Sequence, residues 1–412
     1  MNQSQKTLSL WLVLFIAFMD VMGIGLVYPM FSSMLFSPEA DLLAPEISNA
    51  ARSWYLGMLL AAMPIAQFFS ATVLGALSDQ KGRKWVYLLS MMVGIVGYLI
   101  SVAGVFAKSI TLLVASRVMC GIAAGNEAVV GATIADLSTK ETKAKNFGYF
   151  SLANGVGFMV GPFLGGMLST FSYALPFVMA ACATTANLGL VLLFFRETHQ
   201  TRATAKLCWD DGLRNLKKAF YIPGLRVLFL SAFFACFAWS FFYEFIPVTW
   251  IADYNLDPAG VGFFYAYGAG IFAIASAWLV RPFVSRFGHY GVLFYSLMLM
   301  AAVILLLLIG HSLTWVWVYM ALVNFLVALY YPTYQATVSD FAGNDAQGEV
   351  MGIAMSIQAA AFGLSPLAAG SLLGNNPHMP LLMGGLSMAL AGIVLGVFLR
   401  KQIFRRHRKG GY

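Results

Sequence analysis

Twelve long apolar runs constrain the fold of this chain more than any other feature of its sequence. Of the 412 residues, 60% are hydrophobic and 10% are charged, whereas a soluble domain carries about 25% charged residues. A run of about 20 apolar residues is long enough to cross a bilayer as one helix. Six runs precede a polar segment and six follow it, near residues 8–31, 54–77, 85–107, 110–135, 145–170, 173–195, 225–250, 259–284, 290–310, 313–338, 347–374 and 379–400. Because only helices and closed barrels satisfy the backbone in lipid, the runs predict an all-α membrane protein with 12 transmembrane helices.

The positions of lysine and arginine predict the orientation of these helices. With the N-terminus in the cytoplasm, 22 of the 25 basic residues fall in cytoplasmic segments, which is a strong positive-inside bias. Both termini are therefore expected to be cytoplasmic. The net charge of +8 then reflects topology, and no nucleic-acid partner is needed to explain it.

A repeat indicates that the chain consists of two related halves. Residues 136–166 and 340–370 align without a gap at an offset of 204 positions. Parallel repeats of this kind occur in one large class of transporters. We therefore expect two pseudo-symmetric six-helix bundles, residues 1–196 and residues 225–400. Four pairs of residues coincide in the alignment: Asp136 with Asp340, Gly148 with Gly352, Pro162 with Pro366, and Gly166 with Gly370.

Two polar segments outside the bundles are expected to lie on the inner membrane surface. The linker, residues 197–224, is predicted to contain an amphipathic helix in the membrane interface. It is either a structural tether or a regulatory or partner-binding element. The basic tail, residues 401–412, suits contact with anionic lipid head groups. The apolar stripe of the linker helix consists of Trp209, Leu213, Leu216 and Phe220.

Four charged residues lie well inside the apolar runs, away from their ends: Asp20, Arg117, Glu127 and Glu244. An ionised side chain at the centre of a bilayer costs ~2.5–3.5 kcal/mol or more, so such residues are usually functional. We expect Asp20 to carry a proton in one state and to pair with Arg117 in another; a purely structural ion pair is the alternative. Glu127 and Glu244 are candidates for a second proton site, for binding a cationic substrate, or for a structural role.

Polar and aromatic side chains in the spans are candidates for lining a substrate cavity. Aromatic rings hold cations and planar apolar groups, although this chain is rich in aromatic residues throughout, with 34 Phe. Hydrogen bonding between helices explains the amide side chains equally well. The candidates are Asn126, Asn154, Trp239, Tyr243, Asn324, Gln335 and Gln358.

The loop between the second and third spans has the composition of a conformational clamp. It reads GALSDQKGRKW, with an acid that can pair with basic groups and a glycine that permits a tight turn. Bridges to Asp136 and Lys143 at the end of the fourth span would lock one conformation. The alternative is an ordinary basic cytoplasmic turn. The clamp residues within the loop are Gly75, Asp79, Gly82, Arg83 and Lys84.

Glycines at helical spacing in the fifth span predict close packing against another helix. The repeat copy replaces three of them with Ala361, Ser365 and Ala369, so the close packing belongs mainly to the first half. We interpret the segment as a gating interface against the second bundle. Its residues are Gly148, Gly157, Gly161, Pro162, Gly165 and Gly166.

Enzyme signatures are weak in this sequence. No Gly-x4-Gly-Lys-Ser/Thr motif occurs, and the one faint dinucleotide-like Gly-Val-Gly lies inside an apolar span. The four cysteines are scattered, without the spacing of a disulfide framework or a zinc site. We therefore expect no cofactor and no catalysis, and a proton gradient as the energy source.

Several of these motifs, in this order, resemble those of the major facilitator superfamily. The loop Gly75–Trp85 resembles its signature loop, and Gly148–Gly166 resembles the antiporter motif of its fifth span. Met19–Pro29 and Arg117–Gly125 resemble first- and fourth-span motifs of its drug:proton antiporters. The nearest likeness, over residues 10–198, is to the tetracycline-efflux group. The resemblance implies two six-helix bundles around a central cavity, alternating access and proton coupling.

Three positions depart from that pattern. Ser285 and His289 stand in the second half where the first half has Asp79 and Arg83, so the second clamp should be weaker. Gly97 lies where tetracycline exporters commonly carry an acid, which places tetracycline itself in doubt as a substrate.

Together, the residues and the resemblance predict a monomeric, proton-coupled secondary transporter that exports small organic molecules by antiport. The bacterial inner membrane is the expected location. Proton-coupled uptake of an amino acid, nucleoside or siderophore is the alternative within the fold. A non-transporting membrane sensor or scaffold is the alternative from another class.

Overall fold

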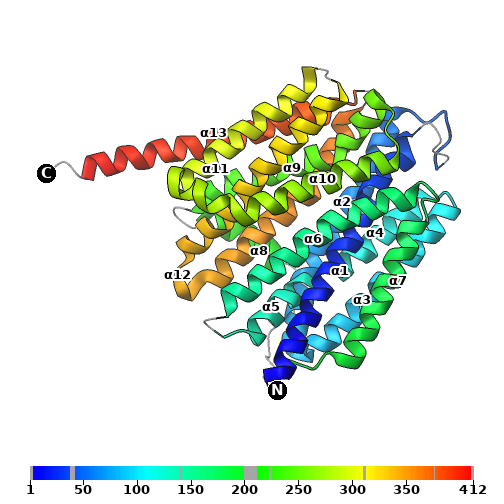
Figure 1. Ribbon diagram of the computed structural model, residues 1–412, viewed down its shortest axis with the longest axis horizontal. Helices are drawn as coiled ribbons and strands as arrows, with labels where there is room; N and C mark the ends of the chain where they lie inside the picture. Colours follow the sequence, from blue (N-terminus) through cyan, green and yellow to red (C-terminus); the bar gives the residue numbers. More distant parts are fainter. Residues whose placement is uncertain are drawn as a thin grey trace. The chain divides into compact units, whose positions relative to one another are not determined.

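The computed structural model describes residues 3–37, 42–139, 142–198, 211–221, 225–309, 312–374 and 376–409. Within these ranges every regular element is a helix (Figure 1). Twelve helical segments of the described chain are long and apolar enough to cross a membrane. Their positions confirm the all-α, twelve-span prediction, because each segment overlaps one of the apolar runs.

Seven helices form the first half of the chain. Serine side chains begin two of them, since Ser48 accepts a hydrogen bond from the amide of Ala51 and Ser109 accepts one from Leu112. Such caps satisfy amides that have no partner within the helix. The helices are α1 (Gln3–Phe36), α2 (Asn49–Lys81), α3 (Arg83–Phe106), α4 (Ile110–Ala124), α5 (Glu127–Leu137), α6 (Lys143–Ser169) and α7 (Leu175–Phe194).

The fourth span is broken near its middle. α4 ends at Ala124, α5 begins at Glu127, and the two together make up the span Ile110–Leu137. A Cβ atom at Gly125 would overlap the Ser70 hydroxyl of α2. Glycine therefore lets the broken segment lie against the α2 backbone.

The linker and the second half contain the remaining elements. Helix α8 occupies the linker segment in which an amphipathic helix is predicted, although Trp209 and the side chain of Phe220 lie outside the described residues. The elements are α8 (Asp211–Tyr221), α9 (Leu225–Tyr254), α10 (Pro258–Trp278), α11 (Val280–Leu306), the 3-10 turn η1 (Leu307–Ile309), α12 (Leu313–Leu373) and α13 (Met379–Lys409).

Helix boundaries in the second half differ from the predicted runs at three points. The sequence predicts a polar turn at residues 341–349, but α12 continues through them as a helix. The helix can continue because no proline in this stretch interrupts its backbone hydrogen bonds. α13 likewise continues into the basic tail, as far as Lys409. The turn predicted between the eighth and ninth spans is a kink inside α11 at Gly288, where φ is 69°.

The chain divides into two compact units. One comprises Met1–Gly212 and Pro247–Ala269, and the other comprises Leu213–Ile246 and Gly270–Tyr412. The end of α9 and the start of α10 therefore group with the first half. The bundle boundaries expected from the sequence, at residues 196 and 225, remain predictions.

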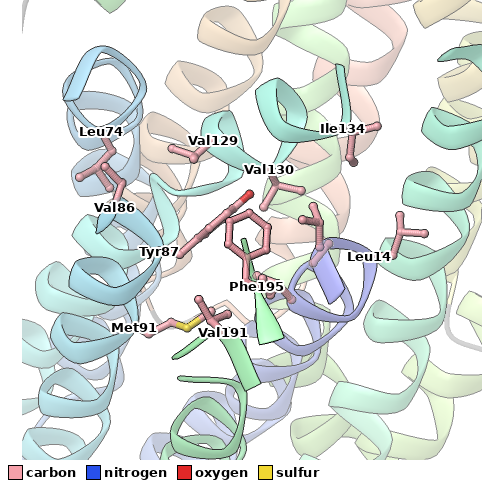
Figure 2. Packing of buried hydrophobic residues seen from close by; sticks show 13 residues of the cluster. Leu14, Leu74, Val86, Tyr87, Met91, Val129, Val130, Ile134, Val191 and Phe195 are labelled. Carbon is pink, nitrogen blue, oxygen red and sulfur yellow. The ribbon is translucent and has the colours of Figure 1, made fainter. Parts of the chain in front are cut away.

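The first unit is organised around α1, which packs on α6, α7 and α5, while α4 packs mainly on α2 and α3. At one end of α3, a cluster of buried side chains joins α1, α2, α3, α5 and the end of α7 (Figure 2). Tyr87 lies at its centre, fully buried, with its ring edge-on to Phe195 at 5.4 Å. The two parts of the fourth span thus differ in their main neighbours: α5 packs on α1 and α2, and α4 packs on α2 and α3.

In the second unit, serine hydroxyls hold α9 and its neighbours together. Ser231 of α9 donates to the carbonyl of Ala391 on α13 at 2.8 Å, and Ser387 of α13 donates to that of Phe234 at 3.2 Å. Ser365 of α12 donates to the carbonyl of Phe237 at 2.8 Å. Small polar residues with interhelical hydrogen bonds are typical of helix packing in membranes.

Candidate functional site

Asp20 is held by an amide side chain. It lies part-buried on α1, and the side-chain nitrogen of Asn126 donates a hydrogen bond to its carboxylate at 3.0 Å. Asn126 itself is buried at the break between α4 and α5. An amide can hold the carboxyl group in either protonation state, but the bond is stronger to the ionised form. The geometry suits a group that gains and loses a proton.

The pairing of Asp20 with Arg117, predicted for one state of the transporter, is not formed in this structure. The Arg117 guanidinium lies over the rings of Phe31 and Phe177, at 5.5 and 5.4 Å from their centres. Its Nη2 donates to the Ser101 hydroxyl at 3.3 Å. Arg117 therefore meets α1 at Phe31, eleven residues beyond Asp20 or about 16 Å along the helix, so the two charges lie at different depths. Aromatic faces stabilise a buried cation electrostatically.

Glu127 has a partner that the sequence did not reveal. The amide of Gln67 on α2 donates to the Glu127 carboxylate at 3.1 Å and to the carbonyl of Ala124 at 3.3 Å. That carbonyl lies at the end of α4, where the backbone ladder stops. Gln67 therefore supports both the acid and the helix break. A polar residue three positions after Pro64 in an apolar run was the available signal.

The predicted clamp residues come together around Arg83. Its guanidinium donates to Asp79 at 2.6 Å and to Asp136 at 3.1 Å, and it also bonds the Ser78 hydroxyl at 2.5 Å. Arg83 is almost completely buried. These contacts join the end of α2, the start of α3 and the end of α5. The side chain of Lys143 lies outside the described residues.

Glu197, which follows α7, completes this corner of the first unit. Its carboxylate accepts from the backbone amides of Arg83 at 3.0 Å and Lys84 at 3.1 Å, and so caps the N-terminus of α3. The Lys84 ammonium in turn donates to the carbonyl of Leu192 on α7. Gly82 has φ of 101°, and a Cβ atom there would overlap the Glu197 carboxylate. Glu197 was not identified from the sequence as part of the clamp. The available signal was an acidic residue at the start of a segment rich in basic residues.

Three glycines of α6 pack against α1, so for Gly157, Gly161 and Gly165 the predicted contact with the second bundle is wrong. A Cβ at Gly157 would lie 2.8 Å from the carbonyl oxygen of Phe18, one at Gly161 would lie 2.6 Å from that of Met22, and one at Gly165 would overlap that of Leu26. α1 carries the carbonyl groups that these glycines approach, so the partner is a helix of the same half. Figure 1 shows α6 running beside α1.

The ends of the segment behave differently. Gly166 meets the start of α10, where its missing side chain leaves room for Gly262, and the ring of Phe163 meets that of Phe263 at 5.2 Å. Pro162 packs on Gly25 of α1. Gly148 has no neighbour within 4 Å of a Cβ position, so it makes no close contact of the predicted kind.

Gly75 and Gly97 also have identifiable packing roles. A Cβ at Gly75 would be 3.9 Å from that of Ala128, which is ordinary contact between α2 and α5. A Cβ at Gly97 would lie 2.9 Å from the Cys120 sulfur and 3.1 Å from Met119. The close approach of α3 and α4 therefore leaves no space for an acidic side chain at position 97.

The second-half counterpart of the clamp is built from local contacts. Ser285 donates to the carbonyl of Pro282, and Arg286 lies over the ring of Phe287. His289 is exposed. This arrangement agrees with the expectation of a weaker second clamp.

The remaining candidates lie mostly in the second unit. Trp239 and Tyr243 of α9 stack at 4.9 Å, and Ser240 donates to the buried Glu244 carboxylate at 3.0 Å. Asn324 donates to the carbonyl of Met320 in its own helix, rather than to another helix. Among the described residues, the side-chain oxygen of Gln335 is buried without a hydrogen-bond partner. The same is true of the side-chain oxygen of Asn154 in the first unit. Gln358 is half-buried.

These features define the chain as a multi-pass membrane transporter with a buried carboxyl group and an arginine-centred clamp. The family model of the Major Facilitator Superfamily matches residues 10–366, and the chain belongs to that family. Members of this family are transporters and not, in general, enzymes.

Individual relatives support the same assignment. The chain is 28% identical over 360 residues to the tetracycline resistance protein, class H, of Pasteurella multocida, which covers 85% of each chain. It is 26% identical over 402 residues to the quinolone resistance protein NorA of Staphylococcus aureus, covering 95% of this chain and 96% of that one. The crystal structure of a D-xylose-proton symporter has a TM-score of 0.75 at 14% identity, over 94% of this chain and 97% of that chain. The structural likeness shows the fold alone.

Proposed function

We propose that this protein exports small organic molecules across a membrane in exchange for protons. The observation that carries the proposal is the Asp20 carboxyl group, part-buried in a membrane span and held by a neutral amide rather than by a cation. A carboxyl group in such a place changes its interactions when it is protonated, and this links proton binding to conformation. Relatives that confer tetracycline and quinolone resistance support drug-like substrates.

The clamp around Arg83 supplies an element with two arrangements. A buried arginine with two carboxylates and a hydroxyl is stable only while all partners are in place, because removing one leaves a buried charge unsatisfied. Alternating access requires such a contact to form in one state and to separate in another. We assign the clamp that role, with Glu197 fixing the start of α3.

Two aromatic rings and an acid lie close together on α9 of the second unit. Trp239 and Tyr243 stack, and the buried Glu244 follows Tyr243 directly. Aromatic faces and a buried carboxylate together favour planar groups with positive charge. The energy source in this proposal is the proton gradient, with no cofactor, and the protein acts as a monomer. Its location is the bacterial plasma membrane, with both termini cytoplasmic.

The direction of coupling is tested with purified protein in proteoliposomes. A proton gradient is imposed, and a fluorescent planar cation and the internal pH are followed together. Antiport predicts that the cation moves against the proton flow and that its movement stops when an ionophore collapses the gradient. Substrate that moves together with protons would make the protein a symporter and would contradict the proposal.

A further inference from the structure

One short helix contacts both the Asp20 site and the clamp. Asn126, at the N-terminus of α5, donates to Asp20 on α1 at 3.0 Å. Thr133 of α5 lies 2.9 Å from the hydroxyl of Tyr87 on α3. Asp136 of α5 accepts from Arg83 on α3 at 3.1 Å. Spacings of seven and three residues place these side chains along one side of a helix.

The middle contact has a defined donor. The Thr133 hydroxyl donates to the carbonyl of Val129 at 2.7 Å, so its single proton is used within α5. The Tyr87 hydroxyl must therefore be the donor in the bond to Thr133. Both side chains are fully buried. A buried hydroxyl that loses its partner is costly, so this bond fixes the position of α5 on α3.

The bond lies in otherwise apolar surroundings. Figure 2 shows the hydroxyl end of Tyr87 pointing towards Val129 and Val130, inside the cluster of buried hydrophobic residues. Asn126 and Thr133 are seven residues apart, which is about 10 Å along a helix, and the two valines lie on α5 between them. Neither valine has a group that could pass a proton along this side of α5. We therefore treat the link between Asp20 and the clamp through α5 as mechanical.

α5 is a short helix with a defined boundary at each end. It begins after the break at Gly125 and Asn126, and it ends at Ser138, whose backbone is extended. Its 11 residues are about 16 Å long. Three polar contacts in a row, one near each end and one between, hold it to α1 and α3.

We propose that Tyr87 and Thr133 are positioning residues for proton coupling: their hydrogen bond keeps α5 on α3 so that a change at Asp20 reaches the Arg83–Asp136 pair. The inference rests on the proposed function, in which Asp20 is the proton site. The charged groups along this route are Asp20, Glu127, Asp136, Arg83 and Asp79.

Transport measurements test the coupling role with Tyr87→Phe, which removes the hydroxyl and keeps the ring on Phe195. Gradient-driven transport should fall about 5- to 10-fold, as expected for the loss of one buried hydrogen bond. Substrate exchange without a gradient should change by less than about twofold, because the binding site is intact. A merely structural role would lower both rates together, and that result would overturn the proposal.

Matched variants separate this bond from general packing. Thr133→Val should reproduce the effect, Thr133→Ser should restore coupling, and the double variant Tyr87→Phe/Thr133→Val should be no worse than either single variant. Ser90→Ala removes a buried hydroxyl of α3 that donates to the carbonyl of Tyr87 within the same helix, and it should leave coupling unchanged. Additive losses, or an equal loss in Ser90→Ala, would contradict the assignment.

A second measurement needs no substrate, so it distinguishes this inference from the proposed function. Amide hydrogen exchange of residues 75–84 is compared at acidic and alkaline pH in nanodiscs. The wild type should show pH-dependent protection that Asp20→Asn abolishes and Tyr87→Phe weakens. If the protein does not transport but the pH-dependent protection still requires Asp20 and Tyr87, only the proposed function is disproved. Exchange that does not depend on pH, or that is unaffected by Tyr87→Phe, would overturn the inference.

Discussion

At the residue scale, the most informative contacts are those that join buried polar groups in the first unit. In each contact, a polar side chain bonds one polar partner from another segment of the chain. The pairs are Asp20 with Asn126, Glu127 with Gln67, and Tyr87 with Thr133. Glu197 differs from these, because it is exposed and binds backbone amides at the start of α3. Its effect should therefore be on stability rather than on proton coupling.

Glu197→Gln tests that distinction. The variant keeps the shape of the cap but loses the negative charge at a helix N-terminus, which should lower the free energy of unfolding by about 0.5–1 kcal/mol. The melting temperature in detergent is the measurement, and gradient-driven transport should persist. Glu46→Gln removes the same charge from another exposed position and serves as the control. An unchanged melting temperature for Glu197→Gln would contradict the capping role.

At the element scale, the contact of α6 with α1 is the closest helix pair built from glycines. Three glycines spaced by four residues each approach a carbonyl group of α1. α1 also carries Asp20, so this packing sets where the carboxyl group lies relative to α5. Small residues that let backbones approach are the usual basis of tight helix pairs in membranes.

Gly165→Ala should disrupt this pair. Its methyl group would overlap the carbonyl of Leu26, and overpacking of this kind typically costs about 1–3 kcal/mol. Thermal unfolding should detect the loss. Gly148→Ala, on the same helix with open space around it, should be neutral or slightly stabilising, because alanine favours helix more than glycine does. Equal effects of the two variants would refute the packing account.

The same elements show what could be predicted from the sequence. The twelve spans follow from apolar runs, and the Arg83–Asp136 contact follows from a local motif with complementary charges. The contact of Asp20 with Asn126 was not predicted, because periodicity gives a residue's face but not its depth against the neighbouring helix. Arg117 also reaches α1, but at Phe31, eleven residues beyond Asp20. The Tyr87–Thr133 bond has no sequence signal of its own.

At the scale of the whole molecule, the chain is a member of the Major Facilitator Superfamily with its charged machinery concentrated in the first half. Asp20, Glu127 and the Arg83 clamp all belong to the first unit, whereas the second unit contributes Glu244 and paired aromatic rings. In the proposed function, this asymmetry corresponds to proton coupling in one half and substrate selection in the other.

Gradient-driven transport by Asp20→Asn tests the central claim most directly. The asparagine keeps the size of the side chain and can still bond Asn126, but it cannot bind or release a proton. In proteoliposomes, the variant should lose at least about 90% of gradient-driven transport, as a removed proton site requires, while exchange of substrate without a gradient continues. Full gradient-driven transport by Asp20→Asn would show that the proton is carried elsewhere and would contradict the account.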